Sequence, residues 1–140
     1  MESNSPTALA DLVRRAQKGD EAAQRELIIS YQHRVAGFVY AMTSKLSDDY
    51  GGGYWQFYIL SNGAFYMAPD SDGRFQVISE NGHECFMSAD ALGITVCLYA
   101  YSHLSFGDDE FSDTCARQYH MLRDFMLEHP EARSILAAID

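Results

Sequence analysis

The chain has 140 residues, a mass of 15.7 kDa, 47% apolar residues and a net charge of −10. This size and composition fit a globular domain that buries enough surface to fold without a disulfide or a metal. Six basic and five acidic groups lie in residues 1–45, whereas four basic and fifteen acidic groups lie in residues 46–140. The acidic part is therefore not expected to bind nucleic acid, because phosphate neutralisation needs clustered Lys and Arg.

Membrane and secreted classes are also disfavoured. The longest uncharged apolar run, Ala91–Tyr101, is too short to span a bilayer, and the N-terminal residues lack a secretory signal pattern. Cys85, Cys97 and Cys115 are an odd number of cysteines without CxxC spacing. This usage favours reduced, mostly buried thiols in a cytoplasmic protein.

Residues 1–45 are predicted to form two helices. Ser5 and Pro6 are typical of a helix cap and first helical position, and Gly19 is a stop signal for this helix. Asp20 can cap a longer helix that ends near Lys45. Its apolar residues recur at helical spacing: Ala23, Leu27, Tyr31, Val35, Phe38 and Met42.

Strand character begins after the turn-forming segment SDDYGGG. The aromatic and branched residues of YWQFYILS indicate a strand. Asn62-Gly63 predicts a type I′ hairpin turn, after which AFYMAP forms a second strand that stops at Pro69. FQVIS follows another turn as a third strand, so we expect a three-stranded antiparallel meander.

The rest of the chain is predicted to be mainly helical. Residues 81–86 are expected to form a loop, and Ser88 can cap a nearly all-apolar helix that ends at Gly107. A further helix is predicted over residues 111–127, and His129-Pro130 starts a last short helix through Ile139. The expected fold is a single α+β domain: a helical part (1–45) and a core (46–140), with a small sheet and four to five helices.

Catalytic patterns are absent from the sequence. It has no GxSxG nucleophile elbow, and its five His residues show no HxxxH or HExxH spacing. We therefore assign no catalytic, cofactor-binding or metal-binding residue and expect no enzyme activity. A metal-dependent hydrolase stays open as an alternative if His83, His103 or His120 converges with carboxylates.

Aromatic residues and acids gather around the first predicted strand, with no Lys or Arg among them. Trp and Tyr are preferred anchors of protein–protein contacts, whereas single-stranded nucleic acid needs aromatics in a basic groove. The segment therefore favours a protein partner, and a core position for Trp55 is the equally weighted alternative. The expected contact residues are Asp48, Asp49, Tyr50, Trp55 and Asn62.

Two parts of the chain resemble two different known families. LVRRAQKGDEAAQRELIISYQHRV resembles the opening helices of extracytoplasmic-function sigma factors, which gives a DNA-binding regulator as another alternative. Three later blocks are similar to the ArdB/KlcA antirestriction family over residues 46–140. They are DYGGGYWQFYILSNGAFYMAPD, MSADALGITVCLYAYSHLSF and LRDFMLEHPEARSILAAID.

The second resemblance implies a small cytoplasmic protein, carried on plasmids and other mobile elements, that relieves type I restriction of incoming DNA. It implies no enzymatic chemistry, no cofactor and no membrane, and a protein partner in the restriction pathway, reached directly or indirectly. An extended DNA mimic must reproduce one charge per ~1.7 Å of duplex axis. The acids of residues 46–140 are too few and too scattered for such a row. The oligomeric state is left open.

Overall fold

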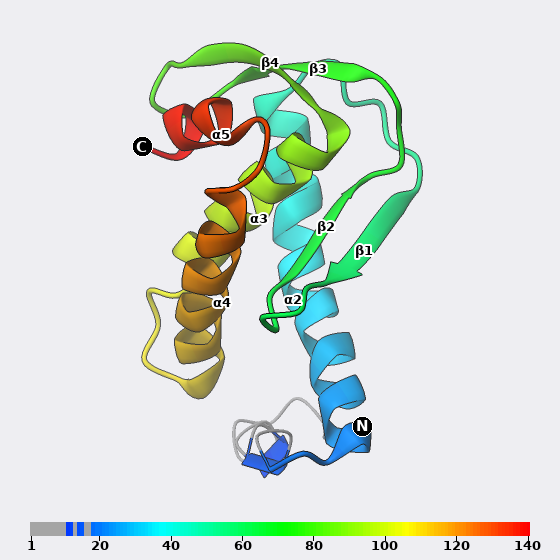
Figure 1. Cartoon of the computed structure of the whole chain (residues 1–140), viewed down its shortest axis with the longest axis vertical. Helices are drawn as coiled ribbons and strands as arrows, with labels where there is room; N and C mark the ends of the chain where they lie inside the picture. Colours follow the sequence, from blue (N-terminus) through cyan, green and yellow to red (C-terminus); the bar gives the residue numbers. More distant parts are fainter. Residues whose placement is uncertain (1–10, 13, 16–17) are drawn as a thin grey trace.

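The computed structural model describes residues 11–12, 14–15 and 18–140. Four strands and four helices follow one another over residues 21–139 (Figure 1), and residues 11–12 and 14–15 are helical as well. Most of the helix predicted from Ser5 lies outside the described residues. The elements are α2 (Glu21–Leu46), β1 (Trp55–Ile59), β2 (Phe65–Pro69), β3 (Arg74–Ile78), β4 (Glu84–Ser88), α3 (Ala89–Leu104), α4 (Glu110–Met126) and α5 (Ala132–Ile139).

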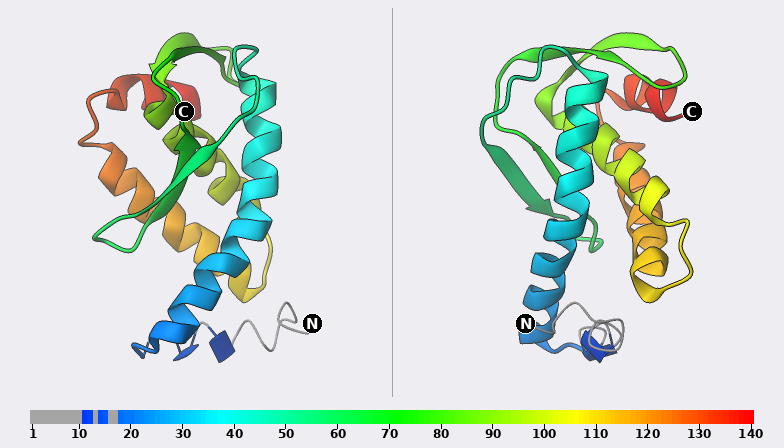
Figure 2. Two further views of the ribbon diagram at one scale, coloured as in Figure 1. Left: turned by 90° about the vertical axis from the view of Figure 1, so that its right-hand side faces the viewer. Right: turned by 180° about the vertical axis from the view of Figure 1, so that it is seen from behind.

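Helix α3 is the centre of the fold. It packs against α2, α4 and α5 and against strands of both hairpins, and nearly all its side chains are buried. Figure 2 shows α2 and α4 lying on opposite sides of it. The predicted cap is confirmed, because the Ser88 hydroxyl accepts a hydrogen bond from the Ala91 N–H at 3.2 Å. An all-apolar helix is stable in water only when its neighbours cover every face, as they do here.

Helix α2 confirms the predicted long helix. The Asp20 carboxylate accepts a hydrogen bond from the Ala23 N–H at 3.2 Å, and the helix ends one residue beyond Lys45. Val35 and Val39 are fully buried against α3, at the spacing of one helix face. The chain then turns through the glycine-rich segment into β1.

Strands β1 and β2 form the predicted first hairpin, in register from Trp55 opposite Pro69 to Ile59 opposite Phe65. The type I′ turn was wrong. Only Gly63 has positive φ, at +91°, and its N–H donates to the Leu60 carbonyl. The connection is thus a three-residue loop that ends in a left-handed glycine, which is another common hairpin geometry.

The three-stranded meander was also wrong, because β3 pairs with β4 in a second sheet. The outer edge of β2 is already occupied by helix side chains. Gln118 accepts from the Phe65 N–H, Tyr101 donates to the Phe65 carbonyl, and the Cys97 thiol contacts the Met67 N–H and carbonyl. These groups leave no free donor on β2 for a third strand, since Pro69 has no N–H.

The predicted loop over residues 81–86 was wrong, because this segment contains the turn of a second hairpin and the start of its second strand, β4. Asn81-Gly82 repeats the geometry of Asn62-Gly63, with positive φ at Gly82. Each asparagine accepts a hydrogen bond from the N–H two residues on and donates to a helix carbonyl, from Asn62 to Met121 and from Asn81 to Ala137. The two hairpins are therefore fastened to α4 and α5 by the same device.

The C-terminal helices close the core. Helix α4 matches its predicted range to within one residue at each end, whereas α5 begins at Ala132, three residues after His129. Residues 129–131 form a turn whose polar groups bind the start of α3. Tyr99 of α3 donates to the Ala138 carbonyl at 2.5 Å, which fixes α5 against α3.

Candidate functional site

Four of the five predicted contact residues lie at or near the connection from α2 to β1, and two of them, Tyr50 and Trp55, are in contact. Trp55 donates its indole N–H to the Tyr50 hydroxyl at 2.9 Å, and the two rings meet edge to face at 5.7 Å. Tyr40 of α2 contacts the other side of Trp55 at 5.3 Å. Trp55 is thus half-buried between two tyrosines and also touches the core. We call Tyr40, Asp48, Asp49, Tyr50 and Trp55 the aromatic corner.

The acidic part of the corner is joined to the second sheet. The Asp49 carboxylate accepts a hydrogen bond from the Gln76 N–H at 2.8 Å, and Asp48 beside it is exposed. Gly52 and Gly53 have φ of +97° and +109°, and a Cβ on either would meet no atom within 4 Å. These glycines are needed for the backbone path into β1, because other residues rarely adopt positive φ.

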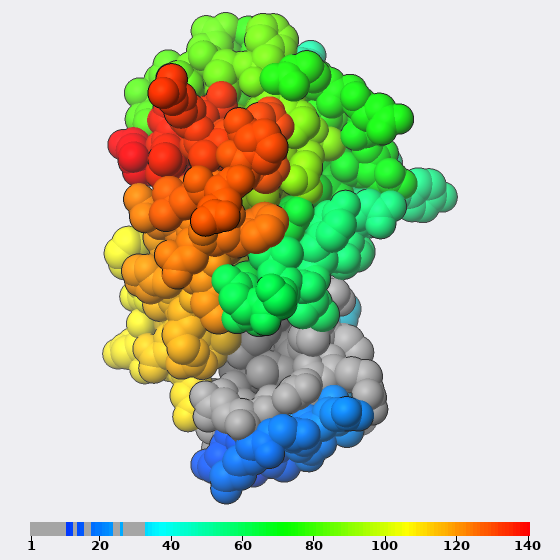
Figure 3. All heavy atoms as spheres, in the orientation of Figure 1, coloured from blue at the N-terminus to red at the C-terminus, as the bar shows by residue number. Residues whose placement is uncertain are grey.

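Asn62 lies at the opposite end of β1 from the aromatic corner. Its amide group donates to the Met121 carbonyl at 3.0 Å and accepts from the Ala64 N–H at 3.0 Å. In the space-filling view the tip of this hairpin lies against α4 (Figure 3). The structure therefore separates Asn62 from the other four predicted residues, with β1 as the link between them.

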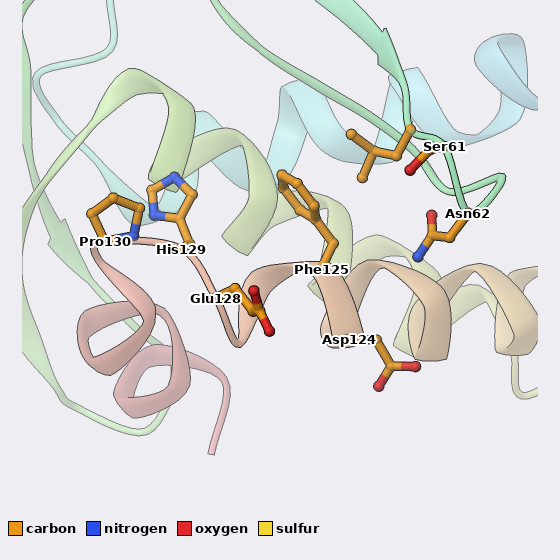
Figure 4. Close-up of a pocket in the computed structure, with 8 residues that line it drawn as sticks. Ser61, Asn62, Asp124, Phe125, Glu128, His129 and Pro130 are labelled. Atoms are coloured by element: carbon orange, nitrogen blue, oxygen red, sulfur yellow. The ribbon is translucent and has the colours of Figure 1, made fainter.

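A pocket opens beside Asn62, and the sequence did not indicate it. It has a volume of about 420 Å³ and lies between the first hairpin loop and the end of α4 (Figure 4). Its carboxylates, Asp124 and Glu128, add negative charge at this end of β1. The lining residues are Leu60, Ser61, Asn62, Asp124, Phe125, Glu128, His129 and Pro130.

A hydrogen-bonded network runs beneath the pocket. The Tyr66 hydroxyl donates to the Asp90 carboxylate at 2.6 Å, and His129 Nε2 lies 2.8 Å from the other oxygen. His129 Nδ1 accepts the Glu131 N–H at 3.0 Å, so the proton of the neutral ring belongs on Nε2 and is donated to Asp90. Burial, and then the Asp90 carboxylate, raise the pKa of Tyr66 far above its ordinary value. The network thus holds three elements together with its protons fixed in place.

The cysteines have structural surroundings. Burial raises the pKa of the Cys97 and Cys115 thiols to about 12, and it also raises that of Cys85. None is therefore a thiolate near neutral pH, which a nucleophilic cysteine requires. Cys97 instead covers the backbone edge of β2.

The three histidines named for the hydrolase alternative lie on different elements. His103 packs on the Phe38 ring of α2, His120 on the Tyr119 ring of α4, and His83 belongs to the second hairpin. Among the residues that the structure describes, no three His, Cys, Asp or Glu side chains are grouped to hold a metal ion. This arrangement offers no support to the hydrolase alternative.

Comparison with known proteins decides the family. The profile of the family described as antirestriction protein matches residues 48–140. The chain belongs to the antirestriction protein family. Antirestriction protein KlcA of Escherichia coli is 40% identical over 110 residues, which cover 76% of this chain and 78% of KlcA. The uncharacterized protein YfjX of E. coli K12 is 42% identical over 105 residues, or 73% of this chain and 68% of YfjX.

The antirestriction fold is matched as well. A chain from the solved structures of KlcA and ArdB superposes with a TM-score of 0.75 and 39% identity, over 86% of this chain and 90% of that chain. Those proteins are described as having a novel fold and antirestriction activity against type I DNA restriction systems in vivo but not in vitro.

The region that the antirestriction profile matches contains all five predicted contact residues, the pocket and the Tyr66–Asp90–His129 network. Tyr40 of the aromatic corner comes before it. The family is named for antirestriction and not for an enzymatic reaction. In the described part of the chain, no helix combines the length and hydropathy that a membrane span needs.

Proposed function

We propose that this protein relieves type I restriction of incoming DNA in the cytoplasm, through contact with a protein and without catalysis. The observation that carries the proposal is its likeness to KlcA and ArdB, whose activity is found in vivo but not in vitro. A mimic that occupied the DNA site of the restriction enzyme would need no further cell component. Activity confined to cells therefore favours action through another cellular protein.

The placement of the acids supports contact with a protein over DNA mimicry. Several carboxylates are used inside the fold: Asp20 and Asp109 cap helices, Asp49 binds a strand N–H, and Glu131 binds Ser88. The Ser112 N–H, and then its hydroxyl, hold the pKa of Asp109 below its usual range. Acids that bind backbone groups do not form the regular charged row that imitates a duplex.

We propose the aromatic corner as part of the contact surface. Trp55 offers an anchor of the kind that dominates protein interfaces, and Asp48 and Asp49 precede it in the segment that leads into β1. Asn62 belongs to the same proposed surface from the other end of β1. The solvent-facing part of Trp55 is available to a partner, while its indole N–H and inner edge are held by Tyr50 and Tyr40.

Trp55→Ala is expected to reduce restriction relief about tenfold or more, since an interface anchor contributes more than ~1.4 kcal/mol. The measurement is the plating efficiency of unmodified phage on a type I restricting host that expresses the variant. Trp55 is half-buried, so the variant should lose about 2 kcal/mol of stability and still fold. Circular dichroism checks this.

The matched control is Phe106→Ala, which removes an aromatic side chain that is 85% exposed on the α3–α4 connection. It should leave restriction relief unchanged. Full relief by a folded Trp55→Ala protein would remove Trp55 from the contact surface.

A further inference from the structure

Strand β1 has an open edge, and its polarity follows from the hairpin register. The Asp70 N–H donates to the Tyr54 carbonyl and the Leu60 N–H to the Ala64 carbonyl, both at 2.8 Å. Even-numbered residues of β1 therefore bond to β2, and the N–H and C=O groups of residues 55, 57 and 59 point outward. The views of Figures 1 and 2 both place β1 at the margin of the molecule.

The other three outer strand edges carry side-chain partners. The β2 edge is covered by Gln118, Tyr101 and Cys97, as described above. On β3, the Gln76 N–H binds Asp49. On β4, the Ser88 N–H binds Glu131, and the Phe86 carbonyl accepts from Arg74. Within the described residues, no such group reaches the outward N–H and C=O groups of β1.

The open edge also lacks the usual protection against strand pairing. Natural edge strands carry Lys, Pro, bulges or covering loops that prevent association. In the part of the chain that the structure describes, β1 has none of these: its sequence is WQFYI, and its pairing with β2 is continuous over all five residues. Ile59 is 61% exposed and Phe57 is 48% exposed on one face of the strand, with Tyr58 on the other.

The negative charge around β1 indicates which kind of molecule can bind its open edge. Residues 46–73 contain four Asp and no Lys, Arg or His. Asp124 and Glu128 of the pocket add acidic groups at the far end of β1. Pairing with a second copy would bring two such acidic segments together, whereas a strand with basic ends would be attracted. Nucleic acid would be repelled for the same reason that the second copy is.

We propose that the open edge of β1 binds an extended segment of a protein partner, with Lys or Arg at both ends and apolar or β-branched residues in the middle. The segment adds to the sheet as a further strand and bonds to the backbone of Trp55, Phe57 and Ile59. Its alternate side chains contact Phe57 and Ile59 on one face and Tyr58 on the other. This inference relies on the proposed function only for the pathway to which the partner belongs.

A model peptide tests the strand addition directly. The probe is a nine-residue peptide with alternating valine and threonine in the centre and two lysines at each end. At saturation, amide hydrogen exchange at Trp55, Phe57 and Ile59 should slow about tenfold or more, while Gln56 and Tyr58, already paired with β2, should change little. A control peptide with glutamate in place of every lysine should bind about tenfold more weakly.

Three results would overturn the proposal. The first is unchanged exchange at the three outward amides in millimolar lysine peptide. The second is equal binding of the glutamate peptide. The third is the same alternating protection when the protein is concentrated alone, because the occupant would then be a second copy.

Two proline substitutions, made in separate variants, test whether the β1 edge is needed for restriction relief. Phe57→Pro removes an outward N–H of β1, and Ile78→Pro removes an outward N–H of β3, so both place proline at an equivalent edge position. With folding checked by circular dichroism, Phe57→Pro should lose the peptide response and most restriction relief. Ile78→Pro should keep both.

The outcomes separate the two proposals. A folded Phe57→Pro protein that still relieves restriction would contradict the role of β1 and leave the proposed function intact. Absence of relief by the unmodified protein would contradict the proposed function, while alternating protection by the lysine peptide would still support strand addition.

Discussion

Replacing Gly93 by alanine should destabilise the protein by about 3 kcal/mol or more, at the upper end for overpacking a core. A Cβ on Gly93 of α3 would lie 2.4 Å from both the Met67 carbonyl oxygen and the Ala68 Cβ on β2. The Met67 oxygen is a backbone atom and the Ala68 Cβ is the whole of a short side chain, so neither can rotate away and α3 and β2 themselves must move apart. Urea unfolding followed by circular dichroism measures the loss.

The chain offers a matched control for Gly93 in α2. A Cβ on Gly37 meets no atom within 4 Å, and this glycine is exposed in a helix interior. Gly37→Ala should therefore stabilise the protein by about 0.5–1 kcal/mol through helix propensity. Similar unfolding midpoints for the two alanine variants would contradict the close approach of α3 to β2.

Replacing Asp90 by alanine should cost about 2–3 kcal/mol, because it leaves the Tyr66 hydroxyl and His129 Nε2–H without their acceptor. Both hydrogen bonds end on a carboxylate, and the His129 side chain is only 10% exposed. Because the Asp90 side chain is 41% exposed, the expected loss is smaller than the sum for two fully buried hydrogen bonds to a charged group. His129 has no alternative tautomer to offer while its Nδ1 accepts from Glu131.

Asp113 provides the control for Asp90, since each is an aspartate in the first turn of a helix. Asp113 is exposed, and its side chain is expected to contribute only about 0.3–1 kcal/mol through the helix dipole. Equal losses in Asp90→Ala and Asp113→Ala, measured by urea unfolding, would show that the network beneath the pocket contributes little to stability.

The features of the fold that the sequence predicted well are those set by neighbouring residues, such as helix caps and the first hairpin. The side chains of Asp20 and Ser88 each accept a hydrogen bond from the N–H three residues further on. These helix caps could therefore be inferred from short segments of sequence. The same holds for the Asn62-Gly63 hairpin. Asn81-Gly82 carries the identical signal, but polar His83 and Glu84 follow it where apolar Ala64 and Phe65 follow Gly63, so the segment is less typical of a strand.

The sheet arrangement could not be predicted in the same way. β2 fails to take a third strand because Cys97, Tyr101 and Gln118, which lie 30 to 53 residues further along, bind its outer edge. No pattern near β2 reports such distant partners. Strand propensity alone therefore suggested a meander where the structure has two separate hairpins.

In the candidate site, too, contacts between sequence neighbours were predictable and contacts between distant residues were not. Asp48, Asp49, Tyr50 and Trp55 are neighbours in the sequence, and of these Tyr50 and Trp55 are in contact, whereas Asp49 binds Gln76 of β3. Asn62 was grouped with them by proximity in the chain, but the length of β1 separates it from them. The Tyr66–Asp90–His129 network was missed, because its members come from three elements at separations of 24 and 39 residues.

We propose that this member of the antirestriction family acts in cells through a protein contact and not as a DNA mimic. Parallel assays on one type I system test it most directly: phage plating on the restricting host, and cleavage of unmodified DNA by the purified restriction enzyme with excess purified protein. We expect relief of restriction in the cell and unchanged cleavage by the purified enzyme. Stoichiometric inhibition of the purified enzyme, reversed by added DNA, would contradict it, as would no relief in cells that contain the folded protein.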